Sequence, residues 1–90
     1  MDNFYTFDGE NVSEDDLKRV FSENPDCGMA VVYTERTGGR ELVNGRMTWI
    51  DRVQTKVIPF AKRKPALDYI GFLRSQTNRS ISDMHIEVAD

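Results

Sequence analysis

Few side chains in this sequence have the chemistry of a catalytic or metal-binding group. The one cysteine, Cys27, lies next to Asp26 and near Glu23, whose negative charges oppose formation of a reactive thiolate. The one histidine, His85, has no second histidine or cysteine near it in the sequence, so the spacing predicts no metal site. The acidic run from Glu14 to Asp16 matches no calcium-binding loop and is typical of a helix start. These residues predict no catalytic group, no metal and no cofactor.

The basic residues are the set whose distribution indicates a partner. Residues 36–79 carry ten Lys or Arg against three acids, whereas residues 1–35 carry nine acids against two bases. This segregation favours an anionic partner for the middle segment, such as RNA phosphates or an acidic protein surface. It is equally consistent with acidic and basic segments that pair within the fold. The predicted binding residues are Arg40, Arg46, Arg52, Lys56, Lys62, Arg63, Lys64, Arg74 and Arg79.

The predicted element at the centre of this basic segment is a helix. Asn44-Gly45 predicts a tight turn, and Thr48 follows it as a candidate helix cap. Apolar residues then recur at helical spacing, so we expect a helix that continues to about Ile58, just before Pro59. Its apolar stripe consists of Trp49, Val53, Val57 and Phe60. As the only tryptophan, Trp49 is the predicted anchor of the core.

A second helix and several short strands complete the prediction. Ser13 is a strong N-cap for a helix that ends before Pro25. The pattern predicts strands at 3–7, 29–34, 40–43, 66–73 and 84–88, a hairpin loop at 37–39 and a polar loop at 76–83. We therefore expect one α+β domain over residues 1–90. It is a two-layer sandwich with a mostly antiparallel sheet of four or five strands and both helices on one sheet face.

Composition sets limits on location. No apolar run approaches the ~20 residues that a membrane-spanning helix needs, and the amino terminus lacks a signal-peptide pattern. A single cysteine cannot form an internal disulfide, which favours a reducing environment. We expect a cytoplasmic protein with no membrane contact.

Four stretches in the same order resemble a known family. They are NPDCGMAVVY at 24–33, GRMTW at 45–49, PALDYIGFLRSQT at 65–77 and MHI at 84–86. Together they resemble the class II glutamine amidotransferase-like proteins of phages and bacteria, in the N-terminal nucleophile hydrolase group. The resemblance covers roughly residues 12–86 and implies a related fold.

The sequence departs from this family at the residues that carry its chemistry. The family's nucleophile is a cysteine that becomes the first residue, with its own amine as the base. Here Asp2 follows the initiator methionine, Phe72 stands where the family has a histidine, and Ile86 replaces a proline. Arg74 and Thr77 match positions that help to hold substrate in the family. The resemblance thus implies a fold reused for binding without amide hydrolysis.

These observations predict a non-enzymatic, cytoplasmic binding protein encoded by a phage. We expect its basic surface to bind RNA or an RNA-handling host factor and to inhibit or modulate that target, as in host takeover or counter-defence. One alternative is a protein-directed inhibitor that uses the acidic amino-terminal part without nucleic acid. Another is a residual amidotransferase-type enzyme. The partners considered are RNA, the acidic surface of a host protein and a second copy of the chain.

Overall fold

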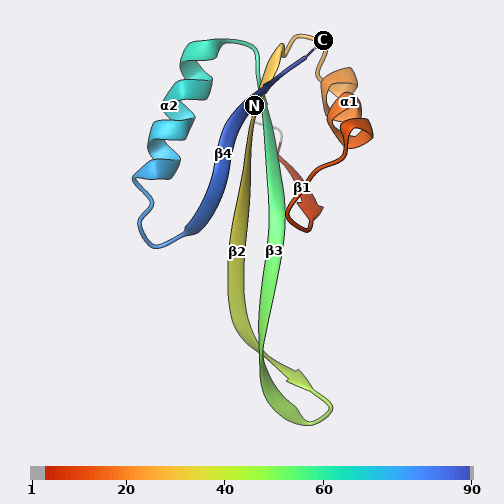
Figure 1. Cartoon of the computed structure of the whole chain (residues 1–90), viewed down its shortest axis with the longest axis vertical. Helices are drawn as coiled ribbons and strands as arrows, with labels where there is room; N and C mark the ends of the chain where they lie inside the picture. The colour runs from red at the N-terminus through yellow and green to blue at the C-terminus, as the bar shows by residue number, and fades with distance from the viewer. Residues whose placement is uncertain (1–3, 90) are drawn as a thin grey trace.

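The computed structural model describes residues 4–89, so Asn3 of the first predicted strand lies outside them. Four strands form one antiparallel sheet in the order β1-β3-β2-β4, accompanied by two helices (Figure 1). The elements are β1 Tyr5–Asp8, α1 Glu14–Glu23, β2 Met29–Val43, β3 Arg46–Phe60, α2 Arg63–Arg74 and β4 Ser80–Val88. The predicted α+β class with an antiparallel sheet is confirmed.

The hairpin of β2 and β3 is the largest element of the fold. Asn44 and Gly45 have φ angles of 51° and 78°, the positive pair that a two-residue type I′ turn requires. All 15 residues of β2 pair with β3, from Val43 opposite Arg46 to Met29 opposite Phe60. The hairpin loop predicted at 37–39 is wrong, because Thr37 to Gly39 lie inside β2, and the chain turns back only at Asn44-Gly45.

The helix predicted from Thr48 is also wrong, since these residues belong to β3. Trp49, Val53 and Val57 are spaced four residues apart, which places them on one face of a helix or of a strand alike. The segment is rich in β-branched and aromatic residues, and the Asn44-Gly45 turn presents it directly to β2. Turn chemistry and cross-strand pairing therefore override the weak cap signal of Thr48.

The strand predicted at 66–73 is instead most of α2. Ala66 and Leu73 are buried and Ile70 is partly buried, a spacing of four and three residues that follows the helical period. Pro65 lies in the first turn of α2, where its missing N–H has no intrahelical acceptor to lose. The run looked like a buried strand because it is short and largely apolar.

The two helices cover opposite faces of the sheet, which corrects the predicted two-layer sandwich with both helices on one face. Val31, Tyr33 and Ile58 pack with α2 through Ala66 and Leu73. Their neighbours along the strands pack with α1 in a second cluster made of Val20, Ala30, Val32 and Val57. Because β2 alternates between these two clusters, the fold has three layers: helix, sheet and helix (Figure 1). We call the two sides of the sheet the α1 face and the α2 face.

The amino-terminal helix agrees with its prediction. The Asp16 N–H donates to the Ser13 hydroxyl oxygen at 3.1 Å, which is the predicted cap. At the other end, the Asn24 side chain donates to the Val20 carbonyl at 2.7 Å and to the Tyr5 hydroxyl at 2.9 Å. These bonds fix the end of α1 against β1. Neither helix within residues 4–89 has the length and apolar character that crossing a bilayer requires.

A bulge in β4 explains why residues 80–83, half of the loop predicted at 76–83, are strand instead. Val32 pairs with His85 and Thr34 with Ser82, so Tyr33 alone faces two residues of β4. One of these, Asp83, has a left-handed backbone with φ of 53°. The extra residue shifts the alternation, so that Ile81 packs with the same core cluster as Met84 and Ile86. This uneven spacing hid the first half of the strand.

This bulge yields a stability prediction. Asp83→Val should lower the free energy of unfolding by about 1–2 kcal/mol, because a side chain branched at Cβ clashes with a left-handed backbone. The matched control Ser82→Val, one residue earlier in ordinary strand conformation, should stay within about 0.5 kcal/mol of wild type. Urea unfolding of both variants makes the comparison. Equal losses in the two variants would contradict the assigned bulge.

Candidate binding arm

The distal half of the hairpin projects from the body as a two-stranded arm (Figure 1). β4 pairs with β2 only as far as Arg36, and β1 pairs with β3 only from Gln54 onward. Residues 37–52 therefore pair only with each other, and we call them the hairpin arm. Two-stranded ribbons of this kind have free backbone edges on both sides and are marginally stable by themselves.

The hairpin arm exposes large apolar side chains that a small protein normally buries. Leu42 is 70% exposed, Met47 64% and Trp49 63%. Leu42 lies directly opposite Met47, and Trp49 is the next residue of β3 on that face. The three side chains therefore form one continuous apolar strip on the α1 face of the arm. Solvent-exposed strips of this kind mark interaction surfaces.

Trp49 is held in a defined position although it is exposed, which overturns its predicted role as core anchor. Its indole N–H donates to the Asp51 carboxylate at 2.7 Å. Its ring lies over Gly38, where a Cβ atom would come within 2.5 Å of the Trp49 ring. The glycine thus leaves the space that the indole occupies. A rigid, exposed tryptophan is the side chain that most often dominates a binding interface.

The cations of the hairpin arm are all arginines. Arg52 pairs with Glu41 across the two strands. Arg40 and Arg46, near the tip, have no ion pair among residues 4–89. Arginine binds carboxylates with two parallel hydrogen bonds and is enriched in protein interfaces, whereas lysine is depleted there. The tip therefore combines two unneutralised arginines with an apolar strip.

The nine predicted basic residues do not share one surface. Arg40 is opposite Trp49 on the α1 face, whereas Arg46, Arg52 and Lys56 lie on the α2 face of β3. Lys62, Arg63 and Lys64 lie at the start of α2, beyond the Phe60 end of the hairpin. The remaining two are Arg74 at the end of α2 and Arg79 just before β4. The molecule is 48 Å long, and the turn and the start of α2 lie at opposite ends of β3.

Several of these cations are already engaged within the fold. Arg79 donates two hydrogen bonds of 2.8 Å to the Glu35 carboxylate, and these bonds lower the pKa of Glu35 below its ordinary value. Lys64 pairs with Asp68 at 3.3 Å, and Lys56 donates to the Thr6 hydroxyl at 3.0 Å. Pairing within the fold, which the sequence left open, thus accounts for part of the charge segregation.

The start of α2 is a second concentration of charge. Lys62, Arg63 and Lys64 stand at the positive end of the helix dipole, where cations are unfavourable, and no acid lies in the first turn. An aromatic cluster lies along the same helix. The Tyr69 ring centroid is 5.7 Å from that of Phe60 and 6.0 Å from that of Phe72. Phe72 is largely exposed. Phe60 and Tyr69 are partly buried against the core, so Phe72 is the open ring of this cluster. Cations on the same helix as an exposed aromatic ring suit the unpaired bases of a nucleic acid.

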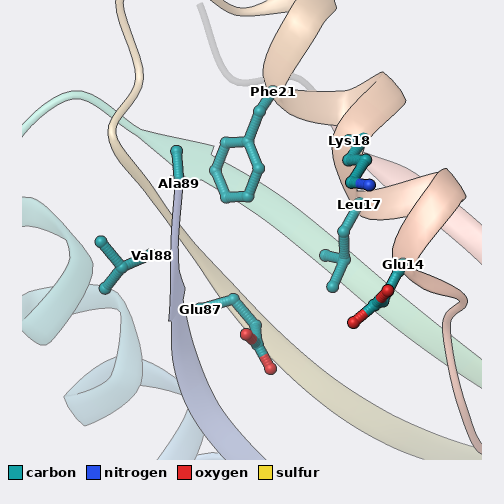
Figure 2. Close-up of a pocket in the computed structure, with 7 residues that line it drawn as sticks. All are labelled: Glu14, Leu17, Lys18, Phe21, Glu87, Val88 and Ala89. Atoms are coloured by element: carbon teal, nitrogen blue, oxygen red, sulfur yellow. The ribbon is translucent and has the colours of Figure 1, made fainter.

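A groove of about 520 Å³ runs between α1 and the end of β4 (Figure 2). Leu17 and Phe21 line it from α1, and Ala89 lines it just beyond β4. The carboxylates of Glu14 and Glu87 line the groove toward the same end (Figure 2). Lys18 also lines it, so its charged residues are two acids and one base.

His85 and Cys27, which were also considered from the sequence, have no catalytic arrangement around them among residues 4–89. The His85 ring contacts the Asp83 carbonyl oxygen through Nδ1 at 2.8 Å and Glu87 through Nε2 at 3.0 Å. Cys27 is partly buried and free. Residues 4–89 contain no group of three or more His, Cys, Asp or Glu side chains placed to hold a metal ion.

The apolar strip of the hairpin arm was missed by sequence reasoning. Asn44-Gly45 was the available signal, because this dipeptide between two alternating segments predicts a hairpin that extends through Trp49. A helix that begins at Thr48 leaves Met47 and Leu42 outside its apolar stripe, so the sequence pattern did not predict them as a binding surface. The predicted Arg40 and Arg46 do belong to the arm, and the structure adds the exposed side chains beside them.

Comparison of the chain with protein-family models, curated proteins and solved structures finds no match in any of the three. The resemblance to amidotransferase-like proteins therefore stays a prediction.

Replacing a buried tryptophan with Ala typically lowers the free energy of unfolding by about 3–5 kcal/mol. Because Trp49 is exposed, we expect no loss of this size. Trp49→Ala should change the thermal midpoint little, because the ring covers only Gly38 and the arm. Gly38→Ala should displace the indole from the strand and change its fluorescence emission while the fold persists. The emission reports on this site alone, since the chain has one tryptophan. Loss of cooperative unfolding in Trp49→Ala would show that the arm supports the whole domain.

Proposed function

We propose that this chain is a non-enzymatic binding protein and that the hairpin arm docks onto an acidic and apolar surface of a protein partner. The observation that carries the proposal is the exposed strip of Leu42, Met47 and Trp49, with Arg40 on the same face and Arg46 on the opposite face. Neither arginine has an ion pair among residues 4–89. If the predicted phage origin holds, the partner is a host protein that the chain inhibits or modulates.

The chemistry of the hairpin arm favours a protein over a phosphate backbone. Tryptophan, methionine and arginine are the residue types enriched in the centres of protein interfaces. The arm carries no lysine, and Asp51 and Glu41 add negative charge that a nucleic acid would repel. Arg40 and Arg46 suit carboxylates of the partner, while the apolar strip gains by removal from water.

A catalytic function has less support. Phe72 stands where the amidotransferase-like family has a histidine, and Ile86 stands where it has a proline. We therefore propose that Arg74 and Thr77, which match substrate-holding positions of that family, play no catalytic part here.

The docking proposal predicts which substitutions abolish binding. With the tagged protein as bait in a bacterial host lysate, wild type should retain a defined partner after nuclease treatment. The double variants Trp49→Ala/Met47→Ala and Arg40→Ala/Arg46→Ala should each weaken retention by about tenfold or more, the size expected for hot-spot residues. Quantitative mass spectrometry of the retained proteins measures the change.

The matched controls lie outside the hairpin arm. Leu67→Ala removes another exposed apolar side chain, on α2, and Lys62→Ala/Arg63→Ala removes two cations at the start of α2. Both controls should retain the partner. A partner lost equally from controls and arm variants would contradict docking through the arm, and one lost only on nuclease treatment would favour RNA.

RNA binding is the second candidate, and the start of α2 is the observation that favours it. Lys62, Arg63 and Lys64 stand there against the helix dipole, and Phe60, Tyr69 and Phe72 form an aromatic cluster along the same layer. A helix keeps such an unfavourable arrangement when an anion compensates for it. The RNA surface would then comprise Lys62, Arg63 and Lys64 of the predicted set, without the hairpin arm.

Replacing Lys62, Arg63 and Lys64 together with Ala tests this candidate. If they contact phosphates, the slope of log affinity against log salt should fall by roughly 0.7 for each lost contact. Stability should be unchanged or slightly raised, because repulsion by the helix dipole disappears. Titration of a single-stranded RNA at several salt concentrations gives the slope. Wild type that fails to bind even at low salt would remove RNA as a partner.

A further inference from the structure

We propose that the hairpin arm of one copy docks into the groove between α1 and β4 of a second copy, and that the second arm docks reciprocally in the first. The inference rests on the proposed function, in that the arm is the docking element. It goes further by naming a partner, a second copy of the chain, and the site that receives the arm.

The groove combines an apolar wall with carboxylates, which is the chemistry that complements the hairpin arm. Leu17 and Phe21 give it an apolar wall, and Glu14 and Glu87 place two carboxylates at one end of it (Figure 2). Among residues 4–89, Glu14 has no ion pair, and the ion pair of the Glu87 carboxylate is with the His85 ring. Lys18 adds one base to the lining, so the groove is partly apolar and carries two acids against one base.

The tip of the hairpin arm has the complementary chemistry. Trp49 and Met47 are large apolar side chains that fit an apolar wall. Arg40 lies on the same face as these two side chains, has no ion pair among residues 4–89 and can bind a carboxylate. The groove belongs to the acidic part of the chain, whereas the tip belongs to the basic part. Charge and apolar surface thus match between two regions of the same sequence.

One chain cannot make this contact with itself. The groove lies near Val88, which pairs with Met29 at the start of β2. The tip of the arm lies at the other end of β2. At about 3.3 Å per residue, the continuous pairing of β2 with β3 holds the two sites roughly 35–45 Å apart. Contact between tip and groove must therefore be intermolecular.

Two copies in antiparallel orientation satisfy both contacts together. Since tip and groove lie at opposite ends of an elongated molecule, rotating one copy by half a turn about a perpendicular axis places each tip at the other copy's groove. The arrangement closes as a dimer and leaves no tip free for further growth. The groove also borders β4, an edge strand, so an extended arm can run beside a free backbone edge.

The intact chain tests this directly, with Trp49 as the only tryptophan. Light scattering during gel filtration should show the mass rising from one chain to two with concentration. Trp49 emission should move to shorter wavelength over the same range as the indole leaves water. The arm variant Trp49→Ala/Met47→Ala and the groove variant Glu14→Lys/Glu87→Lys should each stay monomeric under these conditions. Their circular dichroism should match wild type.

Mixing the two variants gives the sharpest result. The groove variant keeps an intact arm with the only Trp49, and the arm variant keeps an intact groove without tryptophan. Adding the arm variant should shift the emission of the groove variant, because one arm-to-groove contact is restored. This dimer should need roughly tenfold or more higher concentration than wild type, since one of two linked contacts is missing. The control Glu23→Lys/Asp26→Lys changes the same charge outside the groove and should dimerise like wild type.

Three results would overturn the inference. Wild type that stays at the mass of one chain, with constant emission, excludes self-docking. A groove variant that still dimerises would mean that two arms pair with each other. Assemblies that grow beyond two chains would exclude the reciprocal arrangement. The proposed function would survive each result, provided that the arm variants lose their partner from the lysate and the controls do not.

Discussion

The continuous pairing of β2 with β3 is the constraint on which the rest of this structure depends. It begins at Asn44-Gly45, whose positive φ angles permit a two-residue turn, and it runs without interruption for the full length of both strands. Because side chains alternate between faces, a slip of one residue would exchange the residues of the two core clusters. The turn therefore determines that Val31 and Ile58 meet α2 while Val32 and Val57 meet α1.

The same pairing creates an arm whose ordering costs conformational entropy, and contacts within the arm offset part of that cost. Trp49 covers Gly38, Asp51 accepts the indole N–H, and Arg52 pairs with Glu41 across the strands. These contacts order the ribbon but leave Leu42 and Met47 in water. Ordering two strands costs conformational entropy that two exposed apolar side chains do not offset. The arm gains its missing burial when a partner covers it, which is the physical reason to treat it as a binding element.

Sequence reasoning succeeded where one signal had one structural meaning. The Ser13 cap gave α1, the run from Met29 gave a central strand, and the α+β class followed. It failed where one pattern fits two periods. The four-residue spacing of Trp49, Val53 and Val57 suits a helix or a strand, and the segment predicted as a helix is β3. The short apolar run at Ala66 also suits both, and the segment predicted as a strand is part of α2. The faces of the helices and the bulge at Asp83 depend on long-range register, which no local pattern contains.

For the candidate site, the sequence predicted charges but could not place them. Arg79 and Arg52 looked equivalent to Arg40 and Arg46, yet the first two pair with Glu35 and Glu41, whereas the last two have no ion pair among residues 4–89. The reason is geometric: a rigid ribbon holds the tip away from the acidic α1 and from the groove beside it. Within the arm, Glu41 pairs with Arg52, which leaves Arg40 and Arg46 without an ion pair among the described residues. Under the proposed function, these two arginines and the apolar strip of the arm contact a partner whose surface is both acidic and apolar.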